Sequence, residues 1–136
     1  MKFFHIADTH LGAIPDAGFA WSEERRSEIW ESFRSVVAKA DREEVDLLLI
    51  AGDLFHRQPL MRELKEVNYL FTTIPNVKVI LIAGNHDRIR DNSALLSFAW
   101  SPNVTFLMEP TLRSVYFEDI NTEVYGFSYH TTEIKK

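Results

Sequence analysis

Three apolar runs along the chain stop abruptly at polar residues. They cover residues 2–7, 45–52 and 77–84, and they are followed or closed by Asp8, Asp53 and Asn85. The second and third runs, VDLLLIAG and VKVILIAG, are nearly continuous, which is typical of parallel strands covered on both faces. One such ending is ordinary loop chemistry, but three indicate a common cause.

The segments between these runs have helical periodicity. Apolar residues share one face from about residue 23 to residue 43, and Ser22 is suited to the N-cap position. Pro59 is placed to open a second helix, which ends before Pro75. Residues 11–22 read as a loop. Beyond the third run we expect a short helix near residues 92–99, a fourth strand at 103–107, and an antiparallel hairpin from residues 114–119 and 122–128, joined near Asn121.

This order of elements predicts a single α/β domain over residues 1–136. Strand, helix, strand, helix, strand is typical of a largely parallel sheet with right-handed crossovers and flanking helices. The carboxyl ends of parallel strands meet at one edge, where ligands bind in open α/β sheets. We therefore expect Asp8, Asp53 and Asn85 to arrive together at that edge.

The amino-acid composition limits the classes of function that are possible. The 136 residues are 46% apolar, with a formal net charge of −5 and no cysteine. No global basic field attracts nucleic acid, so a phosphate substrate would need bound cations. Disulfides and thiolate zinc sites are excluded. The first apolar stretch is too short for a signal or membrane segment, so a cytoplasmic location without membrane contact is expected.

The strand endings carry donors for a divalent metal. Asp8 and His10 are two residues apart, so in an extended backbone their side chains point the same way. Asp53 and Asn85 add a carboxylate and an amide oxygen. This mixture of oxygen and nitrogen donors suits Mn²⁺, Fe²⁺ or Zn²⁺ better than calcium. Two ions about 3.5–4 Å apart are the usual means of displacement at phosphorus.

The strings DTH, GDLFH and GNHD together resemble the first three motifs of the calcineurin-like metallophosphoesterases. HIADTHLG and AGDLFH are most similar to DNA-repair exonucleases of the SbcD type, and the resemblance runs from Met1 to about Asp91. It implies a sandwich of two sheets flanked by helices, with a two-metal site, Mn²⁺ being favoured, along the sheet edges. This chain would form the first half of that sandwich.

The resemblance also implies roles for single residues. Asp8 and His10 would bind the first metal, Asp53 would bridge, and Asn85 would bind the second. The catalytic group would be His86, oriented by Asp87, with His56 near the substrate phosphate.

The match is incomplete. The family supplies three more metal-binding histidines from its second half, and after His86 the only histidine here is His130. The domain is therefore expected to be truncated before its last metal-binding motifs, with low or no activity alone. The resemblance implies DNA as the substrate of the full protein and an ATPase partner subunit. Because part of the sheet would stay uncovered, we also expect self-association, either through helices of this half, as in the resembled nucleases, or by sheets packing face to face.

Plainer interpretations stand beside these. The three strand-end residues could simply cap helices, and His56 could be an ordinary surface histidine. We expect His5 to be a packed core residue, and Arg88 and Arg90 to face water. His130 as a replacement ligand is the weaker alternative to a strand-end position. For function, the alternatives to a DNA nuclease are a non-catalytic half-domain that binds metal weakly or awaits a completing partner, and a small-molecule phosphodiesterase or phosphatase.

Overall fold

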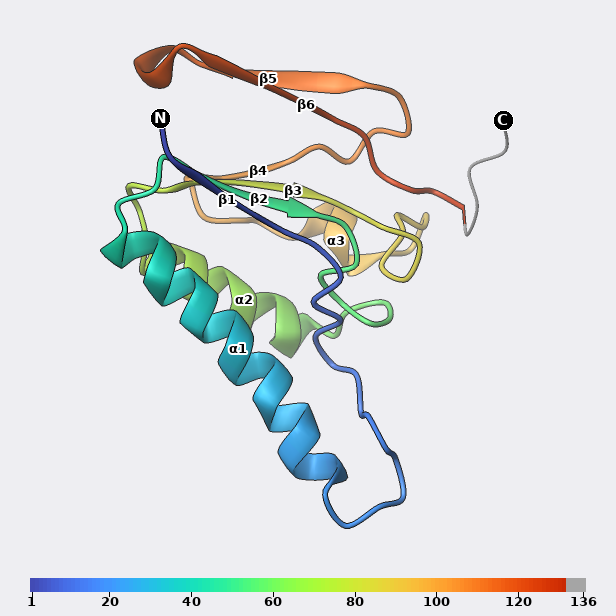
Figure 1. Ribbon diagram of the computed structural model, residues 1–136. Coiled ribbons are helices and arrows are strands. Elements are labelled where there is room, and N and C mark those ends of the chain that lie inside the picture. Colours follow the sequence, from blue (N-terminus) through green and yellow to red (C-terminus); the bar gives the residue numbers. More distant parts are fainter. Residues whose placement is uncertain (132–136) are drawn as a thin grey trace.

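A computed structural model of the chain describes residues 1–131 and has three layers (Figure 1). Two long helices cover one face of a four-stranded sheet, and a β-hairpin lies on the other face. The elements are, in order, β1 Phe3–Ile6, α1 Ser22–Arg42, β2 Leu47–Ala51, α2 Met61–Thr72, β3 Lys78–Ile82, α3 Ala94–Ser97, β4 Val104–Phe106, β5 Arg113–Phe117, the 3₁₀ turn Glu118–Ile120, and β6 Thr122–Gly126.

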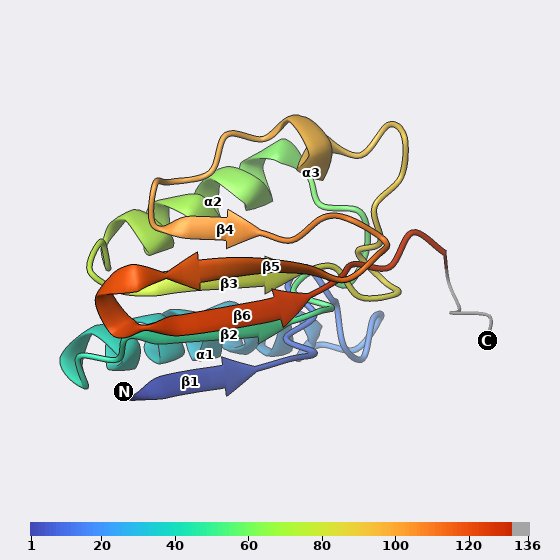
Figure 2. The same ribbon diagram turned by 90° about the horizontal axis from the view of Figure 1, so that it is seen from above.

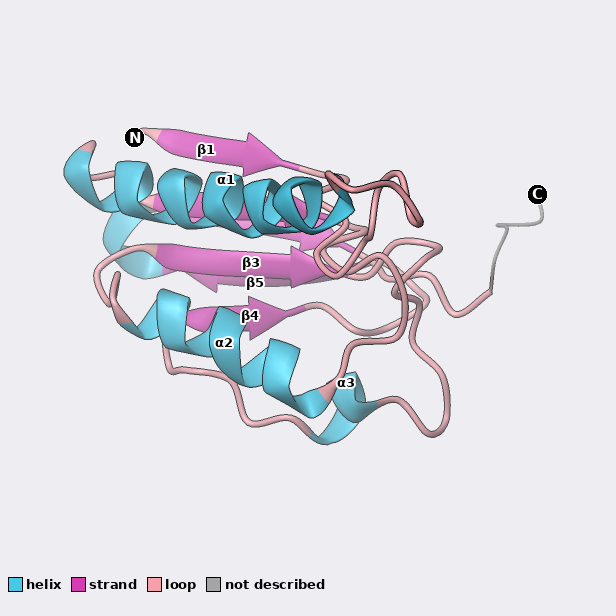
Figure 3. Ribbon diagram, turned by 90° about the horizontal axis from the view of Figure 1, so that it is seen from below, coloured by secondary structure: helices cyan, strands magenta, loops and turns pink. Residues whose placement is uncertain are grey.

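The central sheet is entirely parallel, in the order β1-β2-β3-β4. Phe3 pairs with Leu47, and Leu48 pairs with Val79. All four strands run in the same direction in Figure 3, so their carboxyl ends share one edge, where the connecting loops gather. The predicted α/β class and parallel sheet are confirmed, as is the antiparallel hairpin of β5 and β6.

Two apolar clusters hold the layers together. The larger lies between the sheet and the helices, where Phe33 and Val37 of α1 meet Leu64 and Phe71 of α2, all of them buried. The smaller joins the opposite face of the sheet to the hairpin and includes Leu47, Ile80, Leu107, Val115 and Val124. Both faces of β2 and β3 are therefore covered, which explains their continuous apolar sequence.

The helix starts differ slightly from the prediction. Ser22 is the first residue of α1 rather than its cap, and Trp21 holds the N-cap position. The second helix begins at Met61, two residues after Pro59, because Glu63 accepts a hydrogen bond from the Leu60 backbone N–H at 2.8 Å and fixes the first turn there.

The hairpin covers only the middle of its sheet face. In Figure 2 it lies over β2 and β3, while β1 and β4 extend beyond it on either side. His5 on β1 is consequently exposed, and it lines a cleft of about 190 Å³ between sheet and hairpin with residues such as Leu49, Ile82 and Val124. The expectation that His5 packs in the core was wrong: its side chain is on the hairpin side of the sheet, but β1 lies beyond the part of that face that the hairpin covers.

Candidate metal centre

The segments that follow β1 and β2 are joined by backbone hydrogen bonds. The N–H of Asp8 donates to the carbonyl of Gly52 at 3.1 Å, and that of His10 donates to the carbonyl of Asp53 at 3.0 Å. Leu11 then forms an isolated parallel bridge with Phe55. The two loops thus continue the pairing of their strands past the sheet edge, which fixes their side chains relative to one another.

Asp8, His10 and Asp53 all have left-handed backbone conformations, with φ of +54°, +50° and +50°. Outside glycine this region is uncommon, although Asp and His are among the residues that enter it most readily. Each such residue costs about 1–3 kcal/mol and persists where the surroundings enforce it, typically at functional sites. The three sharp turns aim the side chains at a common point instead of letting them alternate along an extended chain.

Those three side chains form a group suited to a metal ion. Each offers a ligand atom within 4.8 Å of the others. The Nε2 atom of His10 lies 4.0 Å from Asp8 Oδ1 and 3.9 Å from Asp53 Oδ2. Asp53 is 6% exposed, whereas Asp8 is open to solvent. Two carboxylates and an imidazole arranged around one point fit a divalent cation, which would relieve the repulsion between the carboxylates.

Gly84, at the end of β3, makes room for Asp53. A methyl group on Gly84 would overlap the Asp53 carboxylate and backbone. Gly52, with φ of +90°, also lies close to Gly84, because a methyl group there would be 3.0 Å from the Gly84 Cα. Asp53 Oδ1 also accepts a hydrogen bond from the His86 backbone N–H at 2.9 Å. The two glycines therefore allow the ends of β2 and β3 to touch.

Asp87 bonds the backbone at the ends of the second and third strands. Its carboxylate is 2% exposed and accepts backbone N–H bonds from Gly84 at 2.8 Å, Phe55 at 3.1 Å and Asp53 at 3.2 Å. Burial raises the pKa of Asp87, and the bonds from Phe55 and Gly84 oppose that rise. Among residues 1–131 the carboxylate forms no hydrogen bond or ion pair with the His86 ring, and its bonds hold the backbone on either side of the site. The orientation of His86 by Asp87 stays a prediction.

His86 and His56 lie beside the carboxylate group. The His86 Nδ1 atom is 3.0 Å from the backbone carbonyl of His56, which fixes the ring. His56 Nδ1 lies 3.1 Å from His10 Nδ1. Desolvation lowers the pKa of His56, and the neighbouring rings of His10 and His86 lower it further, which favours a neutral imidazole. His56 is thus part of a histidine cluster and not an isolated surface residue.

A groove of about 480 Å³ opens beside these histidines, and Asn85 lines it. Its other lining residues are His56, Arg57, Gln58, His86, Arg88 and Arg90. Asn85 thus shares the edge with the candidate ligands. Arg88 is half-buried, and neither it nor Arg90 forms an ion pair with a carboxylate in the described chain. Arg90 is exposed and Arg88 half-buried, so both reach solvent as expected, and together they form a cationic wall of this groove.

Sequence reasoning missed the contacts that hold this wall. Gln58 donates to the Arg88 carbonyl at 2.7 Å and accepts from the Ser93 hydroxyl at 2.9 Å. Arg57 makes a bidentate pair with the buried Glu63, at 2.9 and 3.0 Å. The available signal was Glu63 three residues after Leu60, which marks the start of a helix but does not reveal that the same carboxylate binds Arg57.

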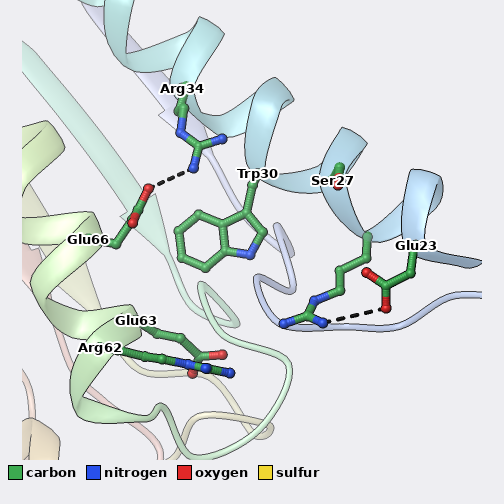
Figure 4. A pocket seen from close by; sticks show the side chains of 8 residues that line it. Glu23, Ser27, Trp30, Arg34, Arg62, Glu63 and Glu66 are labelled. Atoms are coloured by element: carbon green, nitrogen blue, oxygen red, sulfur yellow. Dashed lines mark hydrogen bonds and ion pairs between the residues drawn. The ribbon is translucent and has the colours of Figure 1, made fainter.

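Two other features lie outside the centre. His130 Nε2 is 2.8 Å from the Met108 carbonyl, and His130 belongs to neither metal-suited group found in residues 1–131. A groove of about 350 Å³ runs between α1 and α2 around Trp30 (Figure 4). Its charged side chains largely pair with one another, as Arg34 does with Glu66 at 2.6 Å, so it offers no comparable cluster of unpaired donors.

The fold and this edge define a class of protein. The calcineurin-like phosphoesterase family model matches residues 1–134. The chain therefore belongs to the calcineurin-like phosphoesterases, a family of metal-dependent phosphoesterases.

Its relatives include DNA double-strand break repair proteins Mre11. Those of Aeropyrum pernix and Archaeoglobus fulgidus are 38% and 39% identical over 99 residues, which is 69% of this chain and 23% and 21% of theirs. The uncharacterized metallophosphoesterase YhaO of Bacillus subtilis is 31% identical over 95% of this chain and 34% of its own length. The chain thus spans about a fifth to a third of these relatives. Among its described residues, no helix is long and apolar enough to cross a membrane.

The close approach of Gly84 to Asp53 gives a first prediction. Gly84→Ala forces the Asp53 carboxylate away from His10, so Mn²⁺ affinity, measured from the electron paramagnetic resonance signal of free Mn²⁺, should fall at least about tenfold, comparable to the loss of a supporting contact in a metal site. Gly18→Ala controls for the destabilising effect of a glycine substitution: φ of +92° makes alanine strained there, but no atom lies within 4 Å of the added methyl group. Equal Mn²⁺ affinity in both variants would contradict this account of Gly84.

The lowered pKa of His56 gives a second prediction. In the metal-free chain, the His56 ring should titrate below its ordinary value of 6.5 when followed by NMR. As the pH falls, the unfolded chain protonates at His56 before the folded chain does. The free energy of unfolding is therefore unaffected by this group above pH 6.5 and falls as the pH drops below 6.5. His10→Ala should raise the pKa of His56, whereas His5→Ala should not. A midpoint at or above 6.5 would show that the histidine cluster is open in solution.

Proposed function

We propose that this chain carries the first half of the active site of a two-metal DNA nuclease. Asp8 and His10 would hold the first ion, Asp53 would bridge, and Asn85 would bind the second. Such ions activate a water molecule for attack at phosphorus and neutralise charge on the phosphate oxygens. The observation that best supports this proposal is the convergence of Asp8, His10 and Asp53 in strained conformations. They lie beside a groove whose Arg88 and Arg90 have no carboxylate partner among residues 1–131. Mn²⁺ is the proposed ion, with Fe²⁺ and Zn²⁺ as alternatives.

His86 is proposed as the group that stabilises the transition state or protonates the leaving oxygen. Its Nδ1 atom is engaged by the His56 carbonyl, so Nε2 is the nitrogen free to meet the substrate. His56, neutral and at the mouth of the groove, would contact the phosphate. Residues beyond this chain, or a partner subunit, would complete the ligand set, and low activity is expected of the chain by itself.

The groove favours DNA over a small phosphodiester. The chain has a net charge of −5, yet Arg88 and Arg90 face the groove without carboxylate partners among the described residues. A small diester needs only the metal centre, whereas a polynucleotide presents further phosphates that a cationic wall can bind. A DNA substrate agrees with the names of the Mre11 relatives, which are DNA double-strand break repair proteins. An ATPase partner subunit and a cytoplasmic location, both expected from the sequence, are part of the same proposal.

Charge reversal in the groove tests this choice. Arg88→Glu and Arg90→Glu should each weaken binding of single- and double-stranded DNA in the presence of Mn²⁺ and reduce the salt dependence by about one counterion. Manganese-dependent hydrolysis of bis-p-nitrophenyl phosphate should be unchanged by these variants and abolished by His86→Ala. Arg42→Glu, at the far end of α1, is the matched charge control.

The outcomes separate the candidate functions. If Arg88→Glu and Arg90→Glu reduced DNA binding and bis-p-nitrophenyl phosphate hydrolysis equally, a small-molecule phosphodiesterase would be favoured. DNA binding that is insensitive to Arg88 and Arg90, without hydrolysis of either substrate, would favour a non-catalytic half-domain.

We also propose that the chain self-associates through its helical layer. Leu60 and Met61, at the start of α2, are 45% and 46% exposed, and Tyr69 on the same helix is 66% exposed. Exposed apolar side chains grouped on one element are typical of interaction surfaces. Sedimentation at tens of micromolar should show a dimer that Met61→Glu with Tyr69→Glu dissociates. Tyr125→Glu, on the hairpin, should leave it intact, and the opposite result would indicate sheets packing face to face.

A further inference from the structure

Three histidines from three separate loops gather at the sheet edge. The ring centroids of His10 and His86 are 4.8 Å apart, those of His56 and His86 5.1 Å, and those of His10 and His56 5.2 Å. Their ligand nitrogens all lie within 4.8 Å of one another. This group is distinct from the group of Asp8, His10 and Asp53, and the two groups share only His10.

The two nitrogens of His10 face different groups. Nε2 lies 3.9 and 4.0 Å from the carboxylates of Asp53 and Asp8, while Nδ1 lies 3.1 Å from His56 Nδ1. A neutral imidazole has one lone pair, because its other nitrogen carries the proton. His10 can therefore bind a cation on the carboxylate side or on the histidine side, but a single neutral ring cannot serve both.

The backbone prepares His86 as a ligand. A carbonyl oxygen only accepts hydrogen bonds, so the 3.0 Å contact with the His56 carbonyl places the proton on His86 Nδ1. The lone pair is then on Nε2. Histidine ligands commonly donate their second N–H to a backbone carbonyl, which fixes the tautomer and the ring orientation.

The spacing is close to that of a tetrahedral ion. Two nitrogens bound to one zinc ion at about 2.0–2.1 Å lie about 3.3–3.4 Å apart. The His10 and His56 nitrogens are already at 3.1 Å. The His86 ring is held by the His56 carbonyl, whereas the His56 ring is exposed and can rotate to bring its nitrogen toward His86.

We propose that His10, His56 and His86 form a second metal site, which takes Zn²⁺ and competes with the ion held by Asp8, His10 and Asp53. Imidazole donors favour zinc, copper and nickel, whereas carboxylate oxygens favour manganese and magnesium. Three imidazoles and a water would complete a tetrahedral zinc ion. Zinc bound here withdraws His10 from the carboxylate group and occupies His56 and His86, so it opposes manganese at the sheet edge. The zinc site depends on the three rings alone, whereas its competition with manganese rests on the metal centre of the proposed function, and neither depends on which phosphodiester is cleaved.

Calorimetry of the metal-free chain with Zn²⁺ and electron paramagnetic resonance with Mn²⁺ separate the two sites. His86→Ala and His56→Ala should weaken Zn²⁺ binding at least about tenfold and leave Mn²⁺ binding within about twofold. Asp8→Asn should weaken Mn²⁺ binding at least about tenfold and leave Zn²⁺ binding within about twofold. The His56 substitution keeps the backbone carbonyl that holds His86, so it removes one ligand only. His5→Ala controls for zinc bound by a surface histidine outside the cluster.

Competition tests the shared ligand. Saturating Zn²⁺ should release bound Mn²⁺, and Co²⁺ should give the intense visible absorption of a tetrahedral site, lost in His86→Ala. Far-UV circular dichroism checks that each variant is folded, and His86→Gln replaces any alanine variant that is not. Zinc binding that depends on Asp8 but not on His86 would place zinc among the carboxylates and overturn the proposal. Zinc and manganese bound together without displacement would overturn the sharing of His10.

Discussion

The buried carboxylate of Asp87 ties the ends of β2 and β3 together. It accepts N–H bonds from Asp53 and Phe55, which follow β2, and from Gly84, which ends β3. Removing it would leave three buried donors without a partner, at a cost of about 1–3 kcal/mol each. The orientation of Asp53, the path of the loop that carries His56, and the position of the His86 backbone all depend on this junction.

This junction stabilises strained backbone conformations at the candidate metal centre. Asp8, His10 and Asp53 adopt left-handed conformations that an unconstrained loop would leave. The backbone bonds from Asp8 to Gly52 and from His10 to Asp53 hold the two loops in register. Gly84 keeps the space that the Asp53 carboxylate needs. The side chains are therefore positioned before any ion arrives, which lowers the cost of ordering them on binding.

Acidic and basic side chains lie next to each other at this edge of the sheet. Carboxylates gather on one side of His10, and imidazoles and arginines gather on the other, although the chain as a whole is acidic. His10 belongs to both sides, so its tautomer links the proposed manganese and zinc sites. The pairing of Arg57 with Glu63 neutralises one cation at the groove, whereas Arg88 and Arg90 have no carboxylate partner within residues 1–131.

The apolar runs alone determined the parallel sheet, the shared edge and the arrival of Asp8, Asp53 and Asn85 there, because strand direction follows from the alternation of strands and helices. The family followed from three short motifs at those strand ends. Three features were decided by the tertiary structure: the backbone role of Asp87, the exposure of His5, and the gathering of His10, His56 and His86. Each depends on contacts between residues thirty or more positions apart or on how far the hairpin reaches across the sheet. Local sequence patterns report periodicity and turn chemistry, and they carry no record of which distant side chains share a point in space.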